Sequence, residues 1–348
     1  MSNLNVKVIA AIVPAVVVVV GAIGYFGLSS YSAGKAEKEL KNYLYDNRLE
    51  SYVSWRSLSS SPFGGTITVK DIVLESKRNI PLDLSIEKFV ITNFKDKKQR
   101  MSADMSFKGV RATDPESDYA KSYNRNIFGL FLYPSGKTQV EPYNLNVSWD
   151  YRGDKETLTA QFEVDLPNLF LTNLKLDLED VKELKSALLL TETHDFLDIL
   201  PNIPRWAVWS NDRAVSDSVR SAKQITLKEL DFSYKDQGYL QRVNLLEQRY
   251  NITPTDLAGN IDKQRKQLLK EEYEERHTQC VKEYDSAYKN AKKACTAVIG
   301  TLYAQEKGFK VSAKPEGRVR MDDFERLYGK KRERNSFIER MNLDVKTY

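Results

Sequence analysis

The chain has 348 residues, of which 41% are hydrophobic and 29% charged, and its formal net charge is +5. This composition predicts a folded protein with a sizeable apolar core and argues against a largely disordered chain. The basic excess is small and spread out, whereas nucleic-acid-binding proteins carry a concentrated basic stripe. The nearest run, "GKKRER" at residues 329–334, is short and is interpreted as a solvated helix end. We therefore expect no nucleic-acid partner.

Residues 8–28, "VIAAIVPAVVVVVGAIGYFGL", carry no charge, and their length suffices to span a membrane as a helix. The alternative is a cleaved signal peptide, whose apolar region runs to only about 7–15 residues. The following "SSYSAG" is also an imperfect cleavage site. We predict a short tail over residues 1–7 and an uncleaved single-span anchor over residues 8–28. Lys7, Lys35 and Lys38 flank both sides, so the orientation is inferred instead from the folded, polar body, which we place across the membrane.

After the anchor, helical spacing over residues 29–50 predicts a helical stalk, and from residue 51 the apolar period changes to two. The clearest hairpin is "YNLNVSWDYRGDKETLTAQFEVDLP", which turns at Arg152-Gly153-Asp154. Such alternation predicts an antiparallel sheet with one dry and one wet face over residues 51–254. A long meander of this kind either closes into a core or cups around a ligand.

The stretch "ITLKELDFSYKDQGYLQRV" begins as an alternating strand and continues as a helix. Asp236-Gln-Gly238 interrupts the alternation between them. Glycine adopts the positive φ that a tight exit from a strand needs. We predict that the strand ends here and that the following helix folds back on the sheet.

Two apolar segments interrupt the strands, at Asn126–Lys137 and at His194–Asp212. They are either plugs at the ends of the sheet core, or a lid or a surface that touches lipid, because tryptophan favours the membrane interface. The candidate lipid- or membrane-contact residues are Phe128, Phe131, Trp206 and Trp209.

Residues 255–308 are helical in pattern and heavily charged, and they contain both cysteines of the chain. They are either a helical hairpin packed on the sheet or a coiled-coil surface for a protein partner. In one straight helix Cys280 and Cys295 would lie about 22 Å apart, so a disulfide between them requires the helix to fold back. His277 with Cys280 is only half a metal site, and we expect no metal. Residues 309–348 read as closing strands with a short helix.

The motifs of the common hydrolases, nucleotide-binding folds and zinc proteases are missing from the sequence. A catalytic triad would need His194, whose neighbour Asp195 is adjacent only in sequence. We therefore expect no enzyme, no catalytic residue and no cofactor.

Several stretches, in this order, resemble bacterial envelope proteins of unknown function in the YdgA-like and AsmA-like groups. They are the single N-terminal span and then "VSWRSLSSSPFGGTITVKDIVL", "IEKFVITNF", the hairpin above, "LKELDFSYKDQGYLQRV" and "FKVSAKPEGRVRMDDFERL". The resemblance rests on strand-and-turn patterns, and it transfers no catalytic residue.

Taken together, the residues and the resemblance predict a mainly β fold with α. A single N-terminal transmembrane helix precedes an elongated antiparallel β-sheet domain with a C-terminal helical insert. The resemblance implies a location in the bacterial inner membrane, single-pass, with the body in the periplasm. The expected role is lipid or other hydrophobic ligand binding in a β groove, or support of envelope homeostasis. The alternative is a scaffold or assembly factor that binds an envelope protein through residues 255–308.

Overall fold

The structure is a computed structural model of the 348-residue chain. It describes residues 37–38, 41–42, 44–45, 50–61, 65–75, 83–97, 99–114, 116–117, 120–121, 124–181, 223–256 and 259–348. The predicted anchor over residues 8–28 lies outside the described residues. Of the predicted stalk, residues 37–38, 41–42 and 44–45 are helical, whereas Glu50 lies in a turn; Leu44 is buried.

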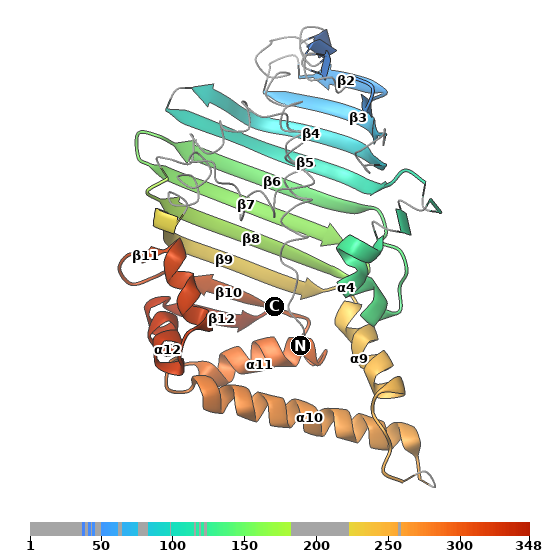
Figure 1. Ribbon diagram of the computed structural model, residues 1–348, viewed down its shortest axis with the longest axis vertical. Coiled ribbons are helices and arrows are strands. Elements are labelled where there is room, and N and C mark those ends of the chain that lie inside the picture. Colours follow the sequence, from blue (N-terminus) through green and yellow to red (C-terminus); the bar gives the residue numbers. More distant parts are fainter. Residues whose placement is uncertain are drawn as a thin grey trace, which may run out of the picture. The chain divides into compact units, whose positions relative to one another are not determined.

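The described part of the chain is mainly an antiparallel β-sheet with some helices, as the sequence predicts (Figure 1). Twelve strands are described: β1 Val53–Ser54, β2 Ser57–Ser60, β3 Thr66–Leu74, β4 Leu84–Lys97, β5 Arg100–Ala112, β6 Tyr143–Arg152, β7 Thr157–Leu166, β8 Phe170–Glu179, β9 Thr226–Asp236, β10 Gly308–Ala313, β11 Val319–Arg320 and β12 Leu343–Thr347. Their hydrogen-bonding order is β1-β3-β4-β5-β6-β7-β8-β9-β10-β12, with β2 on β3 and β11 on β9. Neighbours in this order are mostly neighbours in sequence, which is the meander that the repeated alternation indicates.

The helices are short except for α10. They are the π-helical turn η1 Asn124–Phe128, α4 Gly129–Leu132, the 3-10 turn η2 Tyr133–Ser135, α9 Tyr239–Tyr250, α10 Ile261–Tyr284, α11 Ala291–Leu302, the 3-10 helix η5 Met321–Tyr328 and α12 Lys331–Arg340. None of the helices found in the described residues is both long and apolar enough to cross a membrane.

Two compact units divide the chain. Unit 1 comprises residues 1–128, 142–160 and 179–225, and unit 2 comprises residues 129–141, 161–178 and 226–348. Each unit is therefore described by itself.

Unit 1 has a closed apolar core built on β3, β4 and β5. Val69 pairs with Phe89, which pairs with Phe107, and all three side chains are fully buried. The Phe89 and Phe107 rings pack 4.8 Å apart. Burying side chains of this size contributes about 1.5–3 kcal/mol each. The dry face predicted for these strands is therefore a well-packed core.

Unit 2 contains β8 to β12, part of β7 and most of the helices. The helices α10 and α11 run beside each other as a hairpin, and α11 contacts β10 and the edge strand β12 (Figure 1). This geometry agrees with one of the two interpretations of residues 255–308, a helical hairpin packed on the sheet, with one of its helices against the strands.

Candidate functional site

The apolar face of unit 2 is formed by alternate residues of β7, β8, β9 and β10. The register between β9 and β10 pairs Tyr234 with Phe309 and Phe232 with Val311. The rings of Phe170 and Tyr234 lie 5.5 Å apart, which puts the even-numbered residues of β8 on the same face. We use "apolar face" for this set: Phe162, Val164, Phe170, Leu174, Leu176, Leu230, Phe232, Tyr234, Phe309 and Val311.

The opposite face of the same strands is polar. Glu163 accepts a hydrogen bond from Asn173 at 3.3 Å, and Lys175 forms an ion pair with Asp177 at 3.2 Å. The hydrogen bond that the Lys175 ammonium donates to the Asp177 carboxylate raises the pKa of Lys175. Lys314 pairs with Glu229 at 3.0 Å. Because charges of both signs are paired along this face, we expect it to be in contact with water.

The apolar face is less buried than the core of unit 1. Nine of these ten residues are half-buried and Phe170 is buried, at 7% exposure. Leu166, Leu178 and Ala313, near the strand ends on the same face, are also buried. The centre of the unit 1 core is more buried, since Ile72, Ile86 and Val69 are 0% exposed, although Met101, Trp149 and Tyr151 on the same face are half-buried. Apolar side chains in a half-buried row keep contact surface that a hydrophobic ligand can cover. This difference in burial makes the apolar face the candidate functional site.

One end of the apolar face is an aromatic cluster. Its members are Phe131, Phe170, Phe232, Tyr234, Tyr239 and Phe309. Phe131 packs edge-on against Phe170 at 5.0 Å, and the rings of Tyr234 and Phe309 stack at 6.0 Å. Edge-to-face and offset contacts of this kind add about 0.5–1.5 kcal/mol each beyond area burial. The cluster joins α4, β8, β9, β10 and α9 into one surface.

The turn from β9 into α9 fixes the position of this cluster. β9 ends at Asp236 and α9 begins at Tyr239, and Gly238 between them has φ of +105°, so the predicted strand exit is confirmed. The Asp236 carboxylate accepts hydrogen bonds from the backbone N–H groups of Gly238 at 3.0 Å and Leu240 at 2.9 Å. It thereby satisfies free donors at the start of the helix.

Asp236 also accepts a hydrogen bond from the Tyr234 hydroxyl, at 3.2 Å. Burial, followed by the nearby negative charge of Asp236, raises the pKa of Tyr234 far above its ordinary range. Burial has the same effect on the pKa of Tyr239. Both tyrosines therefore present a neutral ring and hydroxyl group at neutral pH.

A polar network holds the loop after α4 against the loop between β7 and β8. Glu141 accepts hydrogen bonds from Lys137 at 2.8 Å and from Asn168 at 2.7 Å. The hydrogen bond from Lys137, followed by that from Asn168, lowers the pKa of Glu141. Arg242 of α9 donates to the Asn168 carbonyl. The position of α4 is thus set by contacts from β7–β8 and α9.

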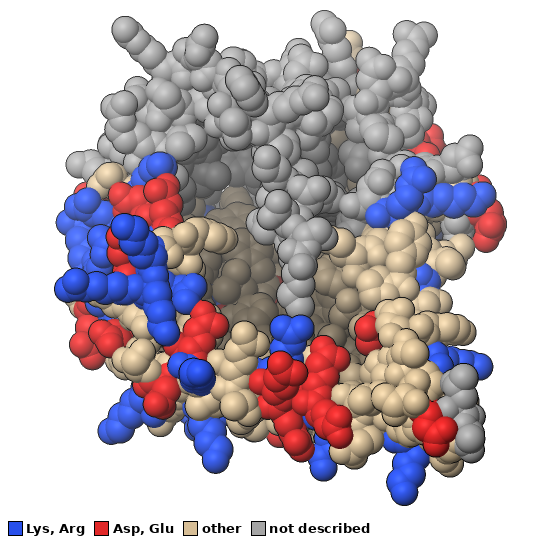
Figure 2. All heavy atoms as spheres, turned by 60° about the horizontal axis from the view of Figure 1, so that its bottom comes forward, with Lys and Arg blue, Asp and Glu red and all other residues tan. Residues whose placement is uncertain are grey.

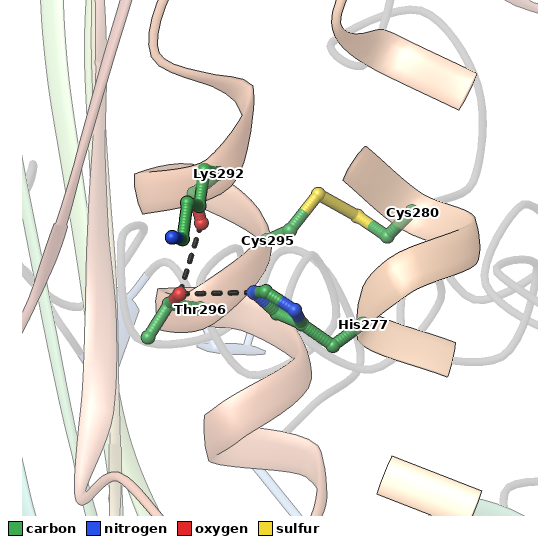
Figure 3. Close-up of a disulfide and its surroundings, with 5 residues drawn as sticks. All are labelled: His277, Cys280, Lys292, Cys295 and Thr296. Carbon is green, nitrogen blue, oxygen red and sulfur yellow. Dashed lines mark hydrogen bonds between the residues drawn. A yellow bond between two sulfur atoms is a disulfide. The ribbon is translucent and has the colours of Figure 1, made fainter. Parts of the chain in front are cut away.

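Cys280 of α10 and Cys295 of α11 form a disulfide, with Cα atoms 5.9 Å apart (Figure 3). The chain folds back between Tyr284 and Ala291, which meets the geometric condition set by the sequence. One turn before Cys280, the His277 ring bonds to the Thr296 hydroxyl at 3.0 Å. This hydroxyl donates to the Lys292 carbonyl, so it accepts from His277 Nε2. His277 is therefore engaged as a structural contact between the two helices.

Of the four predicted contact residues, the structure describes two. Phe128, in unit 1, is buried at 8% exposure against Tyr143, with ring centroids 5.6 Å apart, so its ring does not form an exposed surface. Phe131, in unit 2, is half-buried in the aromatic cluster. Trp206 and Trp209 lie outside the described residues.

Sequence reasoning did not single out the other members of the cluster. Phe170 and Tyr239 lie far from Phe131 along the chain, and each is one apolar residue among many in its own segment. A faint signal was present, because Phe170 and Tyr234 stand at opposite ends of alternating strands beside loop residues.

No grouping of three or more His, Cys, Asp or Glu side chains suited to a metal ion occurs in the described part of the chain. Charged side chains of both signs are interleaved over the surface that comes forward in Figure 2. What the apolar face and the aromatic cluster can do chemically is bind apolar matter through dispersion and desolvation.

No protein-family model matches this chain, and no curated protein matches it in sequence.

Proposed function

We propose that this chain is a membrane-anchored envelope protein that holds a phospholipid or another amphiphile against the apolar face of unit 2. The observation that carries the proposal is the half-buried state of that face beside the fully buried core of unit 1. In a closed core we expect the middle of the face to be as fully buried as Val69, Phe89 and Phe107 are in unit 1.

Three further features support this proposal. The uncharged residues 8–28 suit a single transmembrane span, which would place the body beside lipid. The Cys280–Cys295 disulfide suits an oxidising compartment such as the periplasm. The resemblance to YdgA-like and AsmA-like envelope proteins suggests the bacterial inner membrane as the location. In this proposal the chain catalyses no reaction and needs no cofactor. Lipid surrounds the anchor and is also the ligand of the apolar face.

Photocrosslinking from the two faces of the same strands tests the proposal in intact cells. The photoreactive residue p-benzoylphenylalanine replaces Phe232 or Leu174 on the apolar face of the full chain. Ser233 or Asn173 on the polar face is replaced as the matched control. After growth with radioactive phosphate and illumination, we expect labelled phospholipid on the first pair. Equal labelling of both pairs, or none at Phe232 and Leu174, would refute a phospholipid on this face.

A second candidate function is a scaffold that binds an envelope protein through α10. This helix has 24 residues and none is buried, which is unusual for a helix that packs in a domain. Its surface is braced by ion pairs such as Lys270–Glu274 at 3.7 Å and Arg276–Glu272 at 3.9 Å. Most of the helix surface therefore remains available to a partner.

The same chemistry separates the two candidates. Photoreactive residues at the exposed positions Glu275 and Gln279 of α10 report on a protein partner. If the chain is a scaffold, we expect a discrete protein adduct from these positions and no phospholipid adduct from position 232. Phospholipid at Phe232 without a protein adduct from α10 supports the lipid-binding role alone.

A further inference from the structure

The stretch Gly129–Gly136, "GLFLYPSG", has no charged residue although 29% of the chain is charged. It forms α4 and η2 at the surface of unit 2. Leu130 is 56% exposed and Tyr133 is 54% exposed, whereas Leu132 between them is fully buried. A single exposed leucine is ordinary in a soluble protein, but here Leu130, Tyr133 and Pro134 are exposed within one short uncharged stretch.

This stretch is held in place before any partner arrives. Lys137 N–H donates to the Leu132 carbonyl at 2.9 Å, and the Ser135 hydroxyl donates to the same carbonyl at 2.9 Å. Gly136 ends the turn with φ of +69°, a conformation that favours glycine. The exposure of Leu130 and Tyr133 is therefore built into the local fold, and little ordering entropy remains to be lost on docking.

The stretch leads directly into the aromatic cluster. The Tyr239 hydroxyl donates to the Leu130 carbonyl at 3.4 Å, and the next residue, Phe131, packs on Phe170. Phe170 contacts Tyr234, which stacks on Phe309. A continuous series of rings thus connects this stretch to the apolar face.

The surroundings favour a bilayer over a protein surface. Tyrosine and leucine are the side chains that lie at the boundary between headgroups and acyl chains. The adjoining α9 exposes Leu245 and Tyr250 and carries Arg242, Arg249 and one acid, Glu247, an excess of positive charge that suits anionic lipid. An anchor at residues 8–28 would also keep the bilayer at a high effective concentration.

We infer that Gly129–Gly136 docks into the interface of the membrane that carries the anchor, and that lipid passes from there over the aromatic cluster to the apolar face. The docking step stands on its own, whereas the transfer step rests on the proposed function.

Docking is measured on the full chain reconstituted into vesicles of phosphatidylethanolamine and phosphatidylglycerol. Leu130→Cys and Tyr133→Cys are each labelled with nitrobenzoxadiazole without reductant, so that Cys280 and Cys295 remain bonded to each other. Tyr328→Cys is the control, because Tyr328 is 94% exposed in the same unit. A lipid with a nitroxide near its ester group should remove most of the fluorescence at positions 130 and 133 and little at 328. Quenching that is no greater at positions 130 and 133 than at position 328 would overturn docking.

Transfer is measured with the double variant Leu130→Asp and Tyr133→Asp. Both side chains are exposed, so an intact Cys280–Cys295 bond and an unchanged unfolding midpoint verify the fold. Both the double variant and the parent chain carry p-benzoylphenylalanine at position 232. After a pulse of radioactive phosphate, the phospholipid adduct at this position should form several-fold more slowly in the double variant than in the parent chain. An unchanged rate overturns the transfer route. A parent chain without any adduct refutes the lipid-binding function and the transfer route together, and leaves docking to be judged by its own fluorescence result.

Discussion

At the scale of single residues, Gly238 and Asp236 control the passage from β9 into α9. The glycine supplies a backbone conformation that other residues rarely adopt, and the aspartate supplies the acceptors that the first helical N–H groups need. Because Tyr239 follows at once, this turn also positions one ring of the aromatic cluster.

Gly238→Val should destabilise unit 2 by about 1–3 kcal/mol. The φ of +105° is strained for a β-branched residue, and a Cβ would lie 3.0 Å from the Arg242 guanidinium. The measurement is the free energy of unfolding in urea, with Gly238→Asn as the control because asparagine tolerates positive φ better. An unchanged melting temperature for the valine variant would count against this account of the turn.

In unit 1, Asp150 links the guanidinium groups of Arg100, at 2.8 Å, and Arg152, at 3.2 Å. The hydrogen bond from Arg100 is the largest cause that lowers the pKa of Asp150 below its ordinary 3.8, and Arg152 adds to it against the cost of burial. A depressed pKa means that the stabilising contribution is complete above the unfolded pKa and is lost as the pH falls through the folded pKa.

The variant Asp150→Asn tests this pH dependence. At pH 7 we expect it to be less stable than the parent by roughly 1 kcal/mol or less, because the pair is partly exposed to water. The difference should shrink as the pH falls from about 5 to below 3.8, where the parent carboxylate becomes protonated. Urea unfolding over this range measures it, and a difference that stays constant with pH would exclude the ion pair as its source.

At the scale of elements, the hairpin of α10 and α11 relies on a few contacts between the helices. The Tyr273 and Tyr303 rings lie 5.8 Å apart, and Tyr303 donates to Glu272 at 2.9 Å. Burial, followed by the hydrogen bond to Glu272, raises the pKa of Tyr303 to about 12. Since α10 buries no residue, the disulfide is the strongest single constraint on its position.

Replacing both Cys280 and Cys295 by serine should lower the stability of unit 2 by about 3 kcal/mol, the chain-entropy value for a loop of this size. Thermal unfolding followed by circular dichroism measures the shift. A dithiol reductant should lower the midpoint of the parent chain and leave the double variant unchanged. An equal response of both proteins to the reductant would show that the disulfide does not brace the hairpin.

At the scale of the whole molecule, the proposed location and the disulfide can be tested together. If the body lies in an oxidising compartment, Cys280 and Cys295 should resist a maleimide polymer added to denatured extracts of intact cells. A chain without its first 33 residues, retained in the cytosol, should take up the reagent at both thiols. The full chain should also stay in the membrane pellet after alkaline extraction. Labelling of the full chain would contradict an extracytoplasmic body.

The strand meander and its two faces could be predicted from the sequence because burial of alternate side chains leaves a period of two, as in the β6 residues Leu145 and Val147. The exit of β9 at Gly238 followed from the same local chemistry. By contrast, only one end of α12 was anticipated, from the charged run at residues 329–334. Its segment is rich in charge and buries only Phe337, so no apolar stripe marks it as a helix.

The sequence by itself determined the local choices: which residues form strands, where a glycine ends one, and which face of each strand is apolar. These depend on side-chain patterns within a few residues. Only the tertiary structure decided that Phe131, Phe170, Tyr234 and Tyr239 meet and that Cys280 reaches Cys295. It also decided that most of the apolar face of unit 2 is half-buried, while the centre of the unit 1 core is fully buried. Contacts between distant segments depend on how the strands and helices pack, and a pattern confined to one segment does not contain that information.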